Sequence, residues 1–187
     1  VEEGVRVVGY VERDAYAASV LVARMEDSSL DRAAVFPDLL RFDGRPWRGR
    51  VDCITAGFPC QPVSVAGKQL AQADARWIWR DVARVVGEVG PSIVFLENVP
   101  ALLTAGGGEP FAEVLGSLAS LGFDAEWDCF SAAEVGAPHR RERVFILAYA
   151  ESRRTRAIGQ PHGANGRPGT GGVDVGHANR SGRDGRA

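Results

Sequence analysis

The sequence predicts an α/β fold in which a mostly parallel sheet carries helices on both faces. Apolar, β-branched runs recur at residues 5–11, 51–56, 92–97 and 144–149. Each of the first three runs is followed by a stretch with helical spacing, and this alternation is typical of parallel sheets. Because an open α/β sheet binds ligands at the carboxyl ends of its strands, we expect functional residues just after these runs.

Three amphipathic stretches supply the predicted helices. Residues 15–25 follow an N-cap candidate, Asp14, and residues 78–89 and 111–121 each place their apolar side chains on one stripe. A further strand is predicted at 124–130, between the last helical stretch and the last apolar run.

Length and composition indicate one globular domain. The chain has 187 residues, of which 45% are hydrophobic. It is long enough for one domain with a hydrophobic core and too short for two domains of ordinary size. There is no long apolar run and no signal-like segment at the N-terminus, which predicts a cytoplasmic protein. The three cysteines, Cys53, Cys60 and Cys129, lack paired spacing, which argues against disulfides and a structural zinc site.

The character of the sequence changes after residue 150. Residues 151–187 are rich in Gly and Arg, have almost no apolar periodicity, and carry seven arginines against three acids. Such a segment cannot offset its ordering entropy by burial, so we predict a domain at 1–150 and a disordered tail at 151–187. The basic charge makes this tail the better nucleic-acid candidate, although solvated basic tails are common.

Cys60 is the first candidate catalytic residue. It lies in the segment Phe-Pro-Cys-Gln-Pro directly after a predicted buried strand, and prolines on either side stiffen the loop. An arbitrary cysteine in such a turn is more often a small buried hydrophobe. Here the next strand ends in Phe-Leu-Glu-Asn-Val, which brings the Glu97 carboxyl to the same edge of the sheet and makes it a general-acid candidate.

A third segment, Pro-His-Arg-Arg-Glu-Arg-Val, sets basic residues immediately before the last apolar strand. Alternation would place Arg141 and Arg143 on one face, which is unusual unless that face covers an anion or a polar ring. A surface charge cluster with Glu142 is the alternative interpretation.

Taken in this order, the three segments resemble the cytosine carbon-5 methyltransferase family, whose signatures are a Pro-Cys-Gln loop, a Glu-Asn-Val strand end and a Gln-x-Arg-x-Arg strand. The resemblance covers residues 8–149, and residues 42–52 look like the phage and prophage branch. It implies a Rossmann-like methyltransferase fold that uses S-adenosylmethionine. His139 stands where the family usually has Gln, and one imidazole hydrogen bond can serve the same purpose.

The resemblance also implies roles for individual residues. Cys60 matches the nucleophile, Glu97 the carboxyl that protonates or binds ring N3, and Arg141 and Arg143 the pair that organises the loop and contacts the base carbonyl. The cofactor-binding residues implied by the match are Glu12, which would bind the ribose hydroxyls, and Arg13, Asp38, Leu39 and Pro59.

The chemistry implied is methylation of DNA at cytosine carbon 5 through a covalent Cys60 adduct. The partner would be double-stranded DNA with the cytosine flipped out of the stack. A nearby arginine would favour the thiolate of Cys60, whose free thiol is mostly protonated at neutral pH. The family's Gly-rich cofactor loop and its C-terminal motifs have no match here, so we expect a fragment, a remnant or a subunit that a second polypeptide completes.

Three alternatives stay open on the sequence alone. Methylation of tRNA uses the same chemistry, although the Phe-Pro-Cys-Gln-Pro form favours DNA. A non-catalytic DNA-binding remnant would fit the basic tail. A cysteine hydrolase using Cys60 and His139 would leave Glu12, Glu97 and both arginines unexplained.

Overall fold

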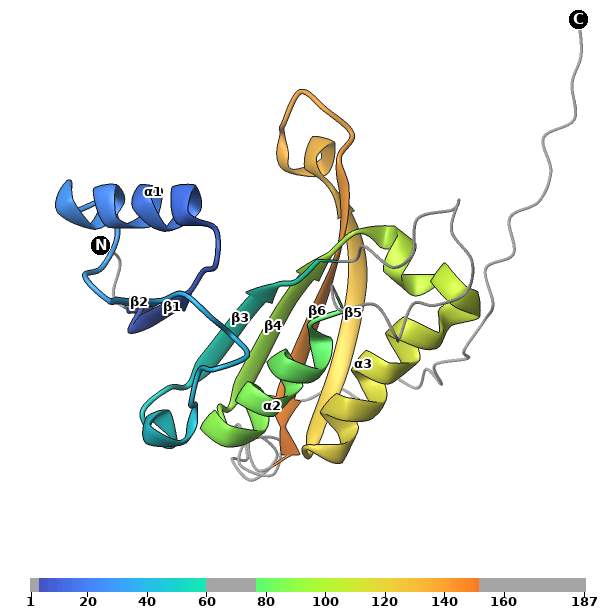
Figure 1. Cartoon of the computed structure of the whole chain (residues 1–187). Coiled ribbons are helices and arrows are strands. Elements are labelled where there is room, and N and C mark those ends of the chain that lie inside the picture. Colours follow the sequence, from blue (N-terminus) through green and yellow to red (C-terminus); the bar gives the residue numbers. More distant parts are fainter. Residues whose placement is uncertain (1–3, 60–76, 152–187) are drawn as a thin grey trace, which may run out of the picture.

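The computed structural model describes residues 4–59 and 77–151 (Figure 1). Its strands and longer helices, in chain order, are β1 (Gly9–Val11), α1 (Ala15–Glu26), β2 (Ala34–Phe36), β3 (Cys53–Gly57), α2 (Trp79–Val89), β4 (Ile93–Asn98), α3 (Glu109–Ser120), β5 (Phe123–Ser131) and β6 (Glu142–Ala150). Short 3-10 helices occupy several connections, among them η1 (Arg45–Trp47) and η6 (Ala132–Val135). None of the described helices could span a membrane.

The strands form two sheets. In the larger, the order is β3-β4-β6-β5, and in the smaller β1 pairs with β2. The β1–β2 and β3–β4 pairs are parallel, whereas β6 runs antiparallel to both β4 and β5. The α/β fold class is confirmed, but the sheet is mixed rather than mostly parallel, because β5 and β6 are joined by a hairpin and not by a crossover helix.

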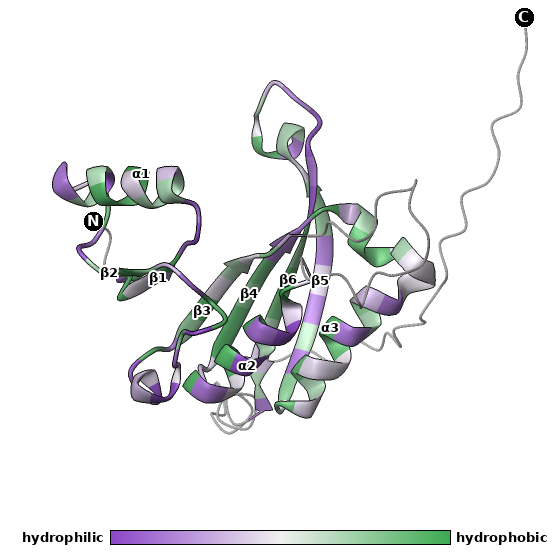
Figure 2. Ribbon diagram, viewed as in Figure 1, coloured by the Kyte–Doolittle hydropathy of each residue, from purple (hydrophilic) through white to green (hydrophobic). Residues whose placement is uncertain are grey.

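The core lies between the larger sheet and the helices α2 and α3 (Figures 1 and 2). Strand β6 alternates strictly, and Val144, Ile146 and Ala148 are fully buried on the helix side. Helix α2 contributes Trp79 and Val86, which are also fully buried. The apolar periodicity of these elements therefore arises because one face of each is buried between the larger sheet and a single layer of helices.

Most predicted boundaries agree with the structure to within a few residues. Asp14 caps α1, and its carboxylate accepts a hydrogen bond from the Ala17 N–H at 2.8 Å. The first strand is shorter than the predicted run at 5–11, since only Gly9–Val11 finds a partner. That partner, β2, was not predicted, because three residues are too few to show an alternating pattern.

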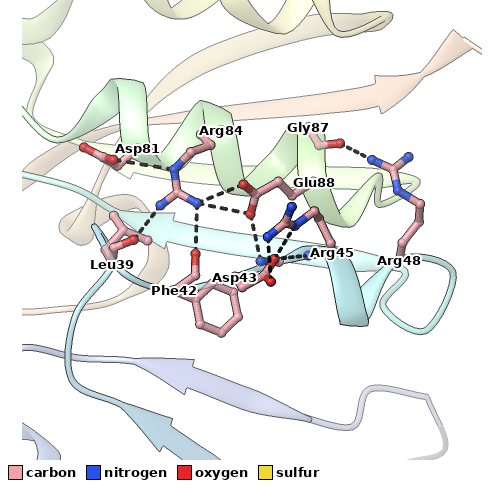
Figure 3. Close-up of polar contacts among 10 residues, drawn as sticks. Leu39, Phe42, Asp43, Arg45, Arg48, Asp81, Arg84, Gly87 and Glu88 are labelled. Carbon is pink, nitrogen blue, oxygen red and sulfur yellow. Dashed lines mark hydrogen bonds and ion pairs between the residues drawn. The ribbon is translucent and has the colours of Figure 1, made fainter.

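A polar cluster fastens the connection between β2 and β3 onto α2 (Figure 3). The Arg84 guanidinium donates to the carbonyl oxygens of Leu39 and Phe42 at 2.7 and 2.9 Å, and it also contacts Glu88 at 3.1 Å. Glu88 in turn accepts the Gly44 N–H at 2.8 Å. A Cβ at position 44 would lie 3.0 Å from side-chain atoms of Glu88 and Val89, so a larger residue would push these neighbours away. The cluster holds the small sheet's connection against the core.

Candidate active site at the edge of the sheet

Three of the segments that the sequence singles out meet at one edge of the larger sheet. Strands β3 and β4 are parallel and end together, with Gly57 opposite Glu97. Strand β6 runs the other way and begins at the same edge, with Val144 opposite Asn98. The carboxyl ends of two strands and the start of a third therefore converge, as the sequence predicts.

Glu97 and Arg143 form an ion pair at this edge. The Arg143 Nε lies 2.6 Å from Oε1 of Glu97, and the side chains are 23% and 38% exposed, respectively. Arg143 Nη1 also donates to the Glu142 carbonyl oxygen at 2.7 Å. A Cβ added at Gly57 would lie 3.2 Å from Oε2 of Glu97, so the glycine lets this carboxyl lie over the end of β3. The pair is half-open to solvent and thus accessible to a polar ligand.

Asn98 ties the end of β4 to the segment that leads to Cys60. It is 4% exposed, its amide Nδ2 donates to the Phe58 carbonyl oxygen at 2.9 Å, and its Oδ1 accepts the Val99 N–H at 2.9 Å. Sequence reasoning missed this role. The signal was present, because Asn98 continues the buried alternation of Val94 and Leu96 and is a polar residue at a core position.

Aromatic packing fixes the described residues on both sides of 60–76. The Phe58 ring lies 5.8 Å from that of Trp77 and 5.2 Å from that of Trp79, and all three are buried. Trp79 Nε1 donates to Ser117 Oγ at 3.2 Å, and Trp77 Nε1 donates to Glu113 at 3.0 Å. Cys60 lies outside the described residues, as does the predicted tail from residue 152 onward.

Arg141 and His139 precede β6 in the hairpin that joins it to β5. Both side chains are exposed, and within the described ranges neither has an ion-pair partner. The Arg141 carbonyl oxygen accepts the Ala132 N–H at 2.8 Å, which closes the base of the hairpin. The structure therefore brings Arg143 to Glu97 and leaves the Arg141 side chain without a contact to that carboxyl.

Most of the predicted cofactor residues follow the carboxyl ends of the two strands of the small sheet. Glu12 follows β1, and its Oε1 accepts the Asp14 N–H at 2.7 Å. Asp38 lies just beyond β2, where its Oδ1 accepts the Leu40 N–H at 2.9 Å. Since β1 and β2 are parallel and end together, both acids lie at the same edge of that sheet.

The other three members of this predicted set differ in their surroundings. Arg13 is exposed beside Glu12, and Pro59 is exposed beyond the end of β3. Leu39 packs against the core cluster, and its carbonyl oxygen is taken by Arg84. Leu39 is thus engaged by the protein's own structure through both its side chain and its carbonyl oxygen.

The fold is that of an S-adenosylmethionine-dependent methyltransferase of the α/β class. A crystal structure of a DNA modification methyltransferase encoded within a prophage (E. coli) superposes with a TM-score of 0.65 at 22% identity, covering 81% of this chain and 42% of that one. More particularly, the chain belongs to the family described as C-5 cytosine-specific DNA methylase, whose model matches residues 2–168.

Curated relatives include type II methyltransferases. M.PspPI of Psychrobacter is 32% identical over 148 residues, which cover 78% of this chain and 35% of the relative. M.BsuFI of Bacillus subtilis is 40% identical over 99 residues, which cover 52% of this chain and 24% of the relative. The chain thus spans about a third or less of the length of these relatives.

Proposed function

We propose that the chain forms part of the catalytic domain of a DNA (cytosine-5-)-methyltransferase. The observation that carries the proposal is the Glu97–Arg143 pair, which lies at the sheet edge where β3 leads into the Pro-Cys-Gln segment. A carboxyl and a guanidinium at one half-open edge can bind a flat polar ring through hydrogen bonds on adjacent atoms. Cytosine offers such a pair of atoms in N3 and O2.

The proposed reaction begins with the Cys60 thiolate, which adds to cytosine carbon 6 and forms a carbon–sulfur bond. Glu97 gives its proton to N3 or binds it, so the electron pair displaced from the carbon 5–carbon 6 bond is stabilised. Carbon 5 would then take the methyl group that S-adenosylmethionine would supply when bound, with S-adenosylhomocysteine as the leaving group. A base removes the carbon 5 proton, and the returning electron pair expels Cys60 as thiolate.

Arg143 and Arg141 would have different parts in this scheme. Arg143 already touches Glu97, so it would hold the carboxyl in place and meet the base carbonyl beside it. Arg141, exposed one residue before β6, would reach the base from the rim. Because the carbon atoms that react are inaccessible in a stacked duplex, the cytosine must be flipped to reach this edge.

The residues at the end of the small sheet fit a ribose-binding role for the cofactor. A carboxylate at the carboxyl end of a parallel strand is suited to accept hydrogen bonds from two hydroxyls. Only one Glu12 oxygen is engaged by the described part of the chain, namely by the Asp14 N–H, so the carboxylate keeps acceptor capacity. Arg13, Asp38, Leu39 and Pro59 complete the proposed cofactor set.

Exposed apolar surface supports a further polypeptide segment as a partner. Val5 and Tyr16 are 87% and 78% exposed, and within the described residues α1 buries only Met25. Strands β1 and β3 each pair with a single described strand, and the Tyr10 hydroxyl is buried without a described hydrogen-bond partner. We infer that a segment outside the described residues, from a longer protein or a second polypeptide, covers this surface.

Transfer of labelled methyl from S-adenosylmethionine to a cytosine-containing duplex tests the function. The chain alone should show little or no transfer, because the cofactor would not be held at reacting distance. Addition of a polypeptide that supplies the family's Gly-rich loop should restore it, and Cys60→Ala should abolish it. Robust transfer by the chain alone would contradict the need for a second segment, and transfer unaffected by Cys60→Ala would contradict the mechanism.

A duplex carrying 5-fluorocytosine makes the same test covalent. With fluorine at carbon 5 no proton can be removed after methyl transfer, so the carbon 6–sulfur bond should persist. Fragment-ion sequencing of the digested protein should then place the nucleotide on Cys60. An adduct on Cys53 or Cys129 instead would contradict the assignment of the nucleophile.

A further inference from the structure

The hairpin between β5 and β6 projects beyond the sheet at the same edge as Glu97 (Figure 1, orange). Its conformation is fixed by its own hydrogen bonds. Ser131 and Glu134 form a reciprocal capping box on η6, and the Ala137 N–H donates to the Ala132 carbonyl oxygen at 2.9 Å. Gly136 completes the turn with a φ of 89°, a conformation that glycine adopts without strain. The hairpin is therefore a preformed projection beside the proposed base site.

This projection carries three basic side chains in succession, His139, Arg140 and Arg141. All three are exposed, and within residues 4–59 and 77–151 none has an ion-pair partner. Elsewhere in the described chain, arginines such as Arg45 and Arg80 are paired with acids at 2.8 and 3.0 Å. Of the hairpin's two acids, Glu134 is engaged in the capping box and Glu142 begins β6. Unpaired guanidinium groups on a fixed projection are available to an external anion.

Alternation along the chain divides the arginines of this segment between two directions. Arg143 points to the face that holds Glu97, and extending the pattern places Arg141 on that face as well. Continuing the same alternation past the start of β6 at Glu142 would place Arg140 on the other face, together with Glu142. The chemistry proposed for the base uses Arg141 and Arg143 and leaves Arg140 without a role.

We propose that Arg140 binds the phosphate backbone of duplex DNA next to the flipped cytosine. This inference rests on the proposed function, because a cytosine at Glu97 brings its own backbone to the rim where the hairpin lies. Each strand carries one phosphate per about 3.4 Å of helix axis, so an arginine one residue from Arg141 and three from Arg143 lies within reach of a phosphate beside the flipped base. The planar guanidinium matches phosphate oxygens in a bidentate manner. Arg140 thus contributes affinity and register but reads no base.

The test is the salt dependence of duplex binding by the full chain, measured by fluorescence anisotropy. Arg140→Gln should weaken binding about eightfold at 0.1 M salt and reduce the slope of log K against log salt by about 0.9, the loss of one phosphate contact. Arg50→Gln is the matched control, because Arg50 is equally unpaired among described residues but precedes β3 at the opposite edge. Glu142→Gln should tighten binding, since it removes the acid on the Arg140 face.

The outcomes separate this inference from the proposed function. An unchanged slope in Arg140→Gln, an equal loss in Arg50→Gln, or no duplex binding by the wild-type chain would each overturn the role of Arg140. Weaker binding of tRNA with unchanged binding of duplex DNA would assign the hairpin to RNA and also overturn it. A reduced slope in a protein that never transfers methyl, even when complemented, would support the phosphate contact and refute the methyltransferase activity.

Discussion

Arg143 Nε lies 2.6 Å from Glu97 Oε1. This ion pair links the start of β6 to the end of β4, its antiparallel neighbour in the sheet. Glu97 is directly opposite Phe145, so the arginine is its diagonal neighbour on the same face of the sheet. The antiparallel direction of β6 is what makes this contact possible. A parallel strand at that position would end, rather than begin, at the edge where Glu97 lies.

Glu97→Gln should remove activity without removing the fold. In a preparation that methylates DNA, we expect the rate of transfer to fall by about 10² to 10⁴, the range for loss of a general acid. The ion pair is partly exposed, so its loss should lower the free energy of unfolding by no more than about 1 kcal/mol. Urea unfolding and methyl transfer measured on the same samples check both statements.

Arg80→Gln is the control for the Glu97 variant. It breaks a partly exposed ion pair with Glu113, on the helical side of the sheet, and should leave methyl transfer unchanged. A tenfold or smaller loss of transfer in Glu97→Gln, or a loss of transfer in Arg80→Gln of the same size, would argue against a chemical role for Glu97.

Asn98→Ala should destabilise the protein and misplace the segment that carries Cys60. The change leaves the Phe58 carbonyl oxygen without its buried donor, which costs about 1–3 kcal/mol. Methyl transfer should fall at temperatures where the variant is fully folded, because Phe58 lies two residues before Cys60. Ser131→Ala, which removes the cap of η6 at the surface, is a useful comparison.

The readout that separates positioning from stability is the rate constant for addition of Cys60 to a 5-fluorocytosine duplex, measured well below the unfolding midpoint. A variant that unfolds more easily but forms the adduct at the wild-type rate would show that Asn98 is only a structural residue.

Helices α2 and α3 and most strands could be found from periodicity because each buries a face of its own. Val144, Ile146 and Ala148 illustrate this, since their burial alternates with residues of the opposite face. The three-residue strand β2 could not be found in this way. This strand forms only because it pairs with β1. A pairing between segments distant in sequence produces no recognisable pattern in the residues of the strand itself.

The candidate site was predicted only as a convergence of strand ends. The Glu97–Arg143 contact depends on the direction of β6, which a hairpin rather than a helical crossover determines. The roles of Gly57 and Asn98 depend on neighbours across the sheet and in the Phe58 segment. The contacts of Gly57 and Arg143 are properties of register, which the pattern within one strand does not encode. The burial of Asn98, in contrast, could have been inferred from the alternation of β4.

Acid should weaken the attachment of the β2–β3 connection to α2. The Gly44 N–H, followed by the Arg84 side chain, holds the pKa of Glu88 below its ordinary value, although burial opposes them. A lowered folded-state pKa contributes stability that is fully present above the unfolded value and is lost as the pH falls through the folded value. We therefore expect part of the free energy of unfolding to disappear below about pH 4.5.

Glu88→Gln should have a lower free energy of unfolding than wild type at pH 7. As the pH is lowered from 7 to 3, that free energy should fall less steeply than it does in wild type. Thermal unfolding across pH 3–7 tests this, with Glu26→Gln reporting the loss of an exposed acid elsewhere. Parallel curves for Glu88→Gln and wild type would contradict the contribution of Glu88.

The last prediction concerns the reactivity of the three thiols. Burial, followed by the charge of Asp52, raises the pKa of the Cys53 thiol, and burial, followed by Asp128 and Glu142, raises the pKa of Cys129. A raised thiol pKa means less thiolate at neutral pH, so both cysteines should react with iodoacetamide more slowly than free cysteine at pH 7.5 and should accelerate as the pH rises. Asp128→Asn should accelerate Cys129 only modestly, because burial is the larger cause, and should leave Cys53 unchanged. If Cys60 is the nucleophile, the fast phase of labelling at pH 7.5 should belong to its peptide and disappear in Cys60→Ala. A fast phase that survives in Cys60→Ala, or that mass analysis assigns to Cys53 or Cys129, would show that the environment of the nucleophile has been placed wrongly.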